Sequence, residues 1–111
     1  MSIGITGTGV YIPYYFIRRD TIAGQWEAKA QKGVRSVCNA DEDSVTMAAE
    51  AAINCLRGFE REKIDGLYFA STTAPYAEKA HSSIIAKVCD LSASTQIADY
   101  MASTRAGLFA V

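Results

Sequence analysis

Apolar positions repeat with a helical period between Asp41 and Gly58. They recur at i, i+3 and i+4 spacing, which places them on one face of an α-helix: Val45, Ala48, Ala49, Ala52 and Leu56. The carboxylates of Asp41-Glu42-Asp43 stand before them, where the helix macrodipole favours negative charge. The pattern predicts a helix that begins near these carboxylates, ends at Gly58 and packs closely between two layers through its small alanines.

Two other stretches favour helices. Arg18–Ala30 is expected to form a short helix opened by Asp20 as its N-cap, with Gly33 marking its end. Lys79–Asp90 predicts a second helix with a core-facing set of Ile84, Ile85, Val88 and Cys89.

Three stretches have the pattern of strands. Leu67–Ser71 is a continuous apolar run, which is typical of a central strand, and Thr95–Tyr100 is another short apolar run. Ser2–Ile12 alternates β-forming residues with glycines before Pro13, which predicts a buried strand with close backbone approach. Gly33–Asn39 is typical of a loop or a short ribbon.

Strands that alternate with helices predict an α/β fold with a parallel sheet covered on both faces. Ligands in such sheets lie beyond the carboxyl ends of the strands. The loop Thr72–Tyr76 and the corner Ala102–Thr104 both follow such ends, so we expect them to face one another. The helix-like run after the corner would direct its free N–H groups at the same place.

Composition excludes several classes of function. Lys plus Arg total 11 and Asp plus Glu total 12 in 111 residues, so the net charge of −1 gives no footprint for nucleic acid. No basic-then-apolar leader and no membrane-length apolar run occur, so neither a secreted nor a membrane protein is indicated. Three separated cysteines, Cys38, Cys55 and Cys89, and one histidine supply no zinc-binding pattern. We expect a cytoplasmic protein with reduced thiols and no metal, in which Cys38 is the best exposed thiol.

A glycine pair, Gly7-Thr8-Gly9, leaves one alternative open. It suggests a dinucleotide-binding loop, but the third glycine of that fingerprint falls on Ile12 and no helix follows at once. An unrelated doubly wound binding module would rest on this loop alone.

Four stretches together resemble the thiolase superfamily, and within it the HMG-CoA synthase and ketoacyl synthase III branch. These are Gly4–Pro13, Asp41–Ala48, Ala70–Lys79 and Asp99–Val111. The resemblance implies a thiolase-like layered fold, of which residues 1–111 would be the N-terminal part of one βαβαβ half with a mostly parallel central sheet. This part would be incomplete without a further segment or partner. The resemblance also implies that strand 95–101 pairs across a homo- or hetero-oligomer interface.

The chemistry that the resemblance implies is condensation or thiolysis of acyl-CoA thioesters through an acylated cysteine. The position of that nucleophile falls on Thr104, and the glutamate that serves HMG-CoA synthases as acid/base falls on Thr72. A nucleophilic Thr104 would need a base, for which His81 is the only histidine. The alternatives are an N-cap role for Thr104 together with Ser103 and a structurally satisfied His81.

The resemblance further places coenzyme A near Trp26 and Arg35, since an aromatic ring stacks on adenine and a guanidinium binds phosphate. Simple packing of the only tryptophan is the alternative. Lys79 would meet a CoA phosphate, pair with Glu78 or Asp43, or remain solvated.

Two functions follow as hypotheses. The first is an HMG-CoA synthase-like acyltransferase portion that takes acyl-CoA or an acyl-carrier thioester as substrate and holds no tightly bound cofactor. The second is a non-catalytic thiolase-fold subunit that builds a heteromeric interface.

Overall fold

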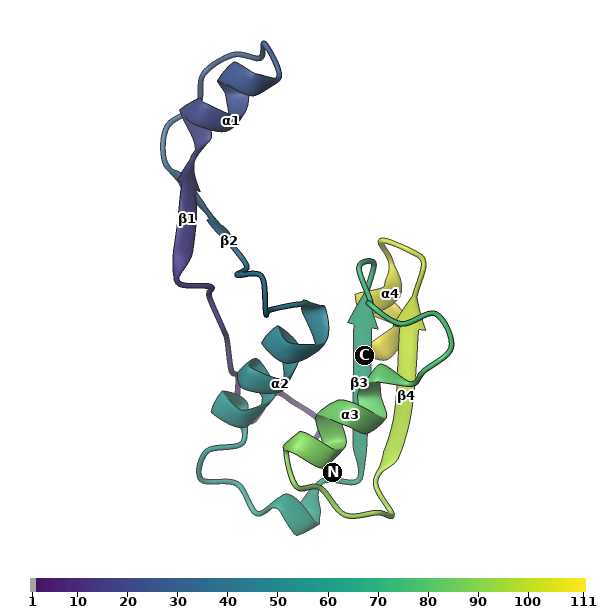
Figure 1. The fold of residues 1–111 in the computed structure, drawn as a ribbon. Coiled ribbons are helices and arrows are strands. Elements are labelled where there is room, and N and C mark those ends of the chain that lie inside the picture. Colours follow the sequence, from purple (N-terminus) through teal and green to yellow (C-terminus); the bar gives the residue numbers. More distant parts are fainter. Residues whose placement is uncertain (1) are drawn as a thin grey trace. The chain divides into compact units, whose positions relative to one another are not determined.

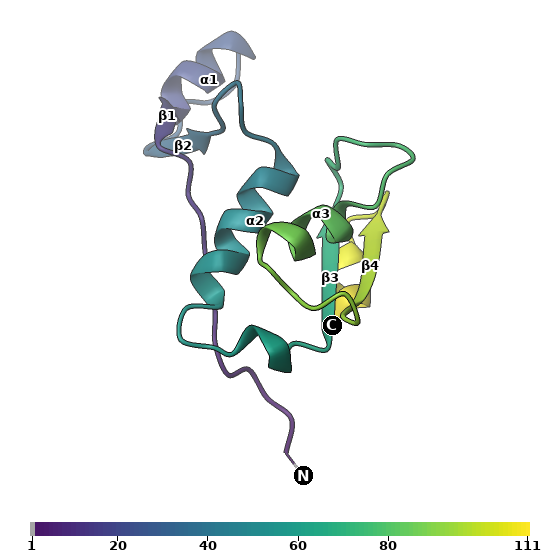
Figure 2. The ribbon, with the colours of Figure 1, turned by 60° about the horizontal axis from the view of Figure 1, so that its bottom comes forward.

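The computed structural model describes residues 2–111, which form two compact units. The larger unit contains the residues up to Tyr11 together with Asp43–Val111, and the smaller unit contains Ile12–Glu42. Figures 1 and 2 show the elements of both.

A parallel pair of strands is the centre of the larger unit. β3 (Gly66–Ser71) pairs with β4 (Gln96–Met101), in a register that runs from Gly66 opposite Gln96 to Ser71 opposite Met101. The crossover between them contains α3 (His81–Val88) (Figure 1). The prediction of an α/β fold with parallel strands joined by a helix is therefore confirmed, since parallel strands require such a crossover.

Helices cover both faces of this sheet. α2 (Ser44–Cys55) and α3 pack beside one another on one face, and α4 (Ala106–Ala110) lies on the other (Figures 1 and 2). A 3₁₀ turn, Arg61–Lys63, leads from α2 towards β3. The core lies where α2 and α3 meet the sheet, and it consists of Val45, Ala49, Phe69, Ile85 and Cys89.

The start of α2 follows from local sequence. The Asp43 carboxylate accepts a hydrogen bond from the Thr46 N–H at 2.9 Å, and the Thr46 hydroxyl accepts one from the Asp43 N–H at 2.8 Å. This reciprocal capping box satisfies two donors that a helix start otherwise leaves unpaired. The predicted apolar face of this helix is confirmed. All five residues predicted for that face either belong to the core or pack against the core.

Three predictions about this unit are wrong. Ser2–Ile12 forms no strand: it is exposed apart from the half-buried Tyr11 and has no strand partner among residues 2–111. Its residues up to Tyr11 run instead along α2, where the Asn54 amide donates to the Val10 carbonyl at 3.1 Å. Val88, the last residue of α3, is 52% exposed rather than core-facing. The α3 helix also begins at His81, later than predicted.

The smaller unit is a ribbon that carries one helix. β1 (Tyr15–Arg18) and β2 (Val34–Val37) pair antiparallel, which confirms a ribbon at Gly33–Asn39. α1 (Arg19–Gln25) follows β1 directly and is capped at its end by Trp26.

Two details of the predicted first helix are wrong. Arg18 is the N-cap, and Asp20 lies in the first turn, where its carboxylate pairs with the Arg18 guanidinium at 2.5 Å. Gly33 lies well beyond the helix, in the turn into β2, with a φ of +97° that favours glycine. No helix formed by residues 2–111 has the length and apolar character to cross a membrane.

Candidate functional site at the carboxyl end of the sheet

The two predicted loops leave the same edge of the sheet. Since Ser71 and Met101 are paired at the ends of β3 and β4, Thr72 and the corner Ala102–Thr104 both begin at this edge. The first turn of the loop is fixed by the Ser71 hydroxyl, which accepts from the Thr73 N–H at 3.0 Å. The Ser44 hydroxyl of α2 donates to the Thr73 carbonyl at 3.0 Å. Thr72 itself is exposed.

The corner after β4 turns through a residue in the left-handed region, Ala102, with a φ of +64°. The Ser103 hydroxyl then accepts a hydrogen bond from the Arg105 N–H at 3.1 Å. Arg105 is the N-cap of α4, so the alternative in which Thr104 together with Ser103 provides the N-cap is wrong. The Ser103 hydroxyl instead binds the N–H of Arg105, and Thr104 is exposed.

His81 is the first residue of α3 and has no exposed surface. Its Nδ1 lies 2.8 Å from the Asp99 carboxylate, and the Tyr76 N–H donates to its Nε2 at 3.0 Å. A backbone N–H can only donate, so Nε2 must be the unprotonated nitrogen and Nδ1 must carry the proton that Asp99 accepts. The ring also stacks between Phe69 and Tyr76, with centroids 5.5 and 5.6 Å away.

These contacts use every polar position of the imidazole. No lone pair remains to accept a proton from Thr104, because Nε2 already accepts one from the Tyr76 N–H. The alternative of a structurally satisfied His81 is therefore confirmed.

Asp99 is a residue whose role the sequence did not reveal. Its carboxylate accepts from the N–H groups of His81 and Ser82 at 2.7 and 2.9 Å, which are the first two residues of α3. Ala80, the N-cap of α3, provides no side-chain cap, so Asp99 caps the helix from the neighbouring strand. Burial raises the pKa of Asp99, but hydrogen bonds from Ser82 and His81 outweigh it and lower the pKa to about 2.

The smaller unit brings two predicted binding residues to one cavity. Trp26 and Arg35 both line a cavity of about 480 Å³. Arg19 and Lys29 line it as well, and no carboxylate does. An exposed indole beside three cations is suited to an anionic, aromatic ligand.

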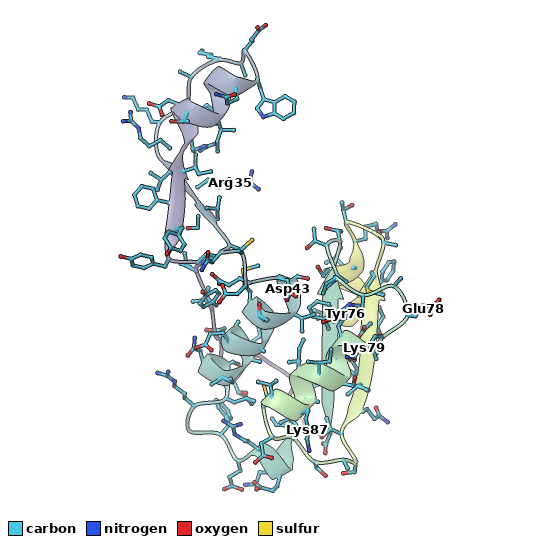
Figure 3. The ribbon with its side chains drawn as sticks, viewed as in Figure 1. Arg35, Asp43, Tyr76, Glu78, Lys79 and Lys87 are labelled. Carbon is cyan, nitrogen blue, oxygen red and sulfur yellow. The ribbon has the colours of Figure 1, made fainter. Side chains whose placement is uncertain are left out.

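The third predicted binding residue, Lys79, belongs to the larger unit. Its ammonium lies 5.2 Å from the centre of the Tyr76 ring, a cation–π contact within one loop (Figure 3). Among residues 2–111, it forms no ion pair with Glu78 or Asp43.

The cysteines occupy unequal environments. Cys38 is exposed, as predicted, Cys55 is half-buried, and Cys89 is fully buried. Cys89 belongs to the core, and its burial raises the pKa of its thiol more than the nearby Arg61 lowers it. Residues 2–111 contain no cluster of three or more His, Cys, Asp or Glu side chains suited to a metal.

Comparison with known proteins gives consistent relatives. Hydroxymethylglutaryl-CoA synthase of Methanosarcina mazei is 36% identical over an alignment 120 positions long, which covers 100% of this chain and 34% of the relative. The enzyme of the same name from Pyrococcus horikoshii is 35% identical, over 96% of this chain and 31% of the relative. The chain thus spans about a third of the length of these relatives. No family model matches.

Solved structures show the same fold. An HMG-CoA synthase complexed with CoA superposes with a TM-score of 0.79 at 23% identity, covering 89% of this chain and 27% of that one. The 3-oxoacyl-(acyl carrier protein) synthase III of Xanthomonas oryzae gives 0.76 at 19% identity, covering 87% and 33%. Together with the parallel β3–β4 unit and its strand-end corner, these matches show that the chain belongs to the thiolase superfamily, as an N-terminal portion of the HMG-CoA synthase and ketoacyl synthase III type.

Proposed function

We propose that this chain is the acyl-CoA-handling portion of an HMG-CoA synthase-like condensing enzyme in which threonines replace two catalytic residues. Thr104 would stand in the place of the nucleophilic cysteine, and Thr72 in the place of the acid/base glutamate. The observation that carries the proposal is the cavity shared by Trp26, Arg35 and two further cations. One relative of the same fold was solved with CoA bound.

The cavity suits the nucleotide end of coenzyme A. Trp26 is 79% exposed, so its ring face is available for stacking on adenine. The guanidinium of Arg35 would bind a phosphate through paired hydrogen bonds, and Lys29 would add a point charge. Lys79, on the other unit, remains a candidate for contact with a CoA phosphate. An acyl-carrier thioester is the second substrate class proposed.

Trp26→Ala is expected to weaken binding of CoA by about tenfold, since stacking of a base on an aromatic ring contributes roughly 1–3 kcal/mol. Isothermal titration calorimetry on the full chain measures the change. Phe16→Ala is the matched control, because Phe16 is also an exposed aromatic residue of the smaller unit but does not line the cavity. Equal affinities for the two variants would remove Trp26 from the site.

The corner can be tested by restoring the thiol. With acetyl-CoA, the unaltered chain is expected to gain no acetyl group at Thr104, because a threonine hydroxyl needs a base and His81 has no free lone pair. Thr104→Cys is expected to become acetylated, since a thiol is far more nucleophilic at neutral pH. Mass spectrometry of the intact chain and its peptides locates the adduct.

The outcomes of this experiment separate two functions. An acetyl group on Thr104 of the unaltered chain would contradict the proposal, because it would show that the threonine itself acts as the nucleophile. A Thr104→Cys variant that binds CoA but stays unmodified would favour the second candidate, a non-catalytic thiolase-fold subunit. The fully occupied imidazole of His81 is the observation that favours this candidate. Strand 95–101 would then serve a homo- or heteromeric interface.

A further inference from the structure

The loop between β3 and α3 is held closed on His81. Its Tyr76 N–H donates to the imidazole Nε2 at 3.0 Å, and its Tyr76 ring stacks on the imidazole with an interplanar angle of 23°. Lys79 of the same loop lies against the Tyr76 ring (Figure 3). The imidazole has no exposed surface while these contacts are in place.

The hydrogen bond to Tyr76 depends on the charge of the imidazole. A neutral ring with its proton on Nδ1 offers Nε2 as an acceptor, whereas an imidazolium has a donor at both nitrogens and meets the Tyr76 N–H with a second N–H. We propose that His81, held by Asp99, is a positioning residue for residues 72–80 and that protonation of Nε2 releases this loop from the carboxyl end of the sheet. The inference rests on contacts within the larger unit and is independent of the proposed function.

Of the pair Asp99 and His81, only the histidine takes up the proton that opens the loop. Because its pKa is about 2, Asp99 stays ionised at every pH above about 4. An ionised Asp99 holds Nδ1 in either state and stabilises the imidazolium that forms when the loop moves aside. The loop therefore closes on neutral His81 and opens as the pH falls.

Other titratable groups on the surrounding elements do not bond to the imidazole. Within residues 2–111, none of the following forms a hydrogen bond or ion pair with it: Asp43, Glu50 and Cys55 on α2 and its cap; Tyr68 and Tyr100 on the strands; Glu78 and Lys79 on the loop; Lys87 and Cys89 on α3 and its end. The release is therefore assigned to one proton on one ring.

Opening would change the part of the loop that leads into α3. Residues 72–80 begin at Thr72, and Thr73 accepts a hydrogen bond from Ser44 on α2. When Tyr76 leaves His81, the loop loses that anchor but keeps the bonds of Thr73 to Ser71 and Ser44 and the bond between Ser83 and the Ala80 carbonyl. The part that moves is therefore the segment between Thr73 and Ala80.

Nuclear magnetic resonance tests the proposal without mutation, because the chain contains a single histidine. The ¹⁵N shifts of the neutral ring are expected to show the Nδ1–H tautomer, together with a protected Tyr76 amide. As the pH is lowered and these shifts change to those of an imidazolium, the Tyr76 amide is expected to lose protection by about tenfold, after correction for intrinsic exchange. Amides of α2 should keep their protection.

His81→Gln is the matched variant, since its amide oxygen offers an acceptor to the Tyr76 N–H but takes up no proton. After correction for intrinsic exchange, the protection of residues 72–80 in this variant should be independent of pH. A ring that stays neutral until the chain unfolds, or one that protonates while the Tyr76 amide stays protected, would overturn the proposal. The same loss of protection in His81→Gln would also overturn it, and the measurements on the unaltered chain stand even where the variant does not fold.

Discussion

Replacing Asp99 with alanine is expected to lower the free energy of unfolding by about 3 kcal/mol, because it leaves two buried helix-start N–H groups and an imidazole N–H without an acceptor. Those three donors come from His81 and Ser82 and now share one carboxylate. The charge also interacts favourably with the N-terminus of α3. Urea unfolding at pH 7, followed by circular dichroism, measures the loss.

The same carboxylate makes stability depend on pH. The pKa of Asp99 is about 2 in the folded protein against an ordinary value of 3.8, so the unfolded state binds the proton more tightly. The stabilisation is fully present above about pH 4 and is lost as the pH falls towards 2, amounting to about 2 kcal/mol. In Asp99→Ala this portion of the acid dependence should be absent.

Asp65→Ala is the matched control for this carboxylate. Asp65 is an exposed aspartate just before β3, and it should tolerate the change within about 0.5 kcal/mol. Equal stabilities of the Asp99 and Asp65 variants would show that α3 does not depend on its cap from β4.

Gly9→Ala is expected to destabilise the larger unit by about 2 kcal/mol, within the range for overpacking. A methyl group at Gly9 would lie 2.3 Å from the Ala51 carbonyl oxygen and the Cys55 nitrogen of α2. Both are helix backbone atoms, which do not move aside as a flexible side chain does. The segment before Tyr11 must therefore separate from α2 and lose the hydrogen bond between Asn54 and Val10.

Gly4→Ala provides the comparison within the same segment, since nothing lies within 4 Å of the added methyl group there. Its free energy of unfolding should match that of the unaltered chain. Hydrogen exchange of residues 2–11 would report the separation from α2 in the Gly9 variant alone. A Gly9 variant as stable as the Gly4 variant would contradict the close packing of this segment on α2.

Local patterns predicted the larger unit well where they did not depend on distant partners. The apolar face of α2 follows from a spacing of three and four residues, and β3 and β4 follow from short continuous apolar runs, so all three could be recognised in sequence. The Ser2–Ile12 pattern misled because a strand exists only beside a partner that takes up its N–H and C=O groups. Gly9 does permit the predicted close approach, but to a helix.

The candidate site shows the same division. That Thr72 and the corner share one edge follows from the order of strands and helices, since parallel strands place their carboxyl ends together. Trp26 and Arg35 share a cavity, and only the resemblance led us to expect them at one site. Eight residues and a turn separate them in sequence, so no local pattern connects them.

What the sequence by itself determined is the start of α2 at the carboxylates of Asp41–Asp43, the α2 core face and the alternation of strands with helices, all of which rest on residues a few positions apart. Only the tertiary structure decided that Asp99 of β4 caps α3 and fixes the tautomer of His81, across 18 residues of chain. Hydrogen bonds of that kind leave no periodic signal, because they depend on the packing of α3 against the sheet.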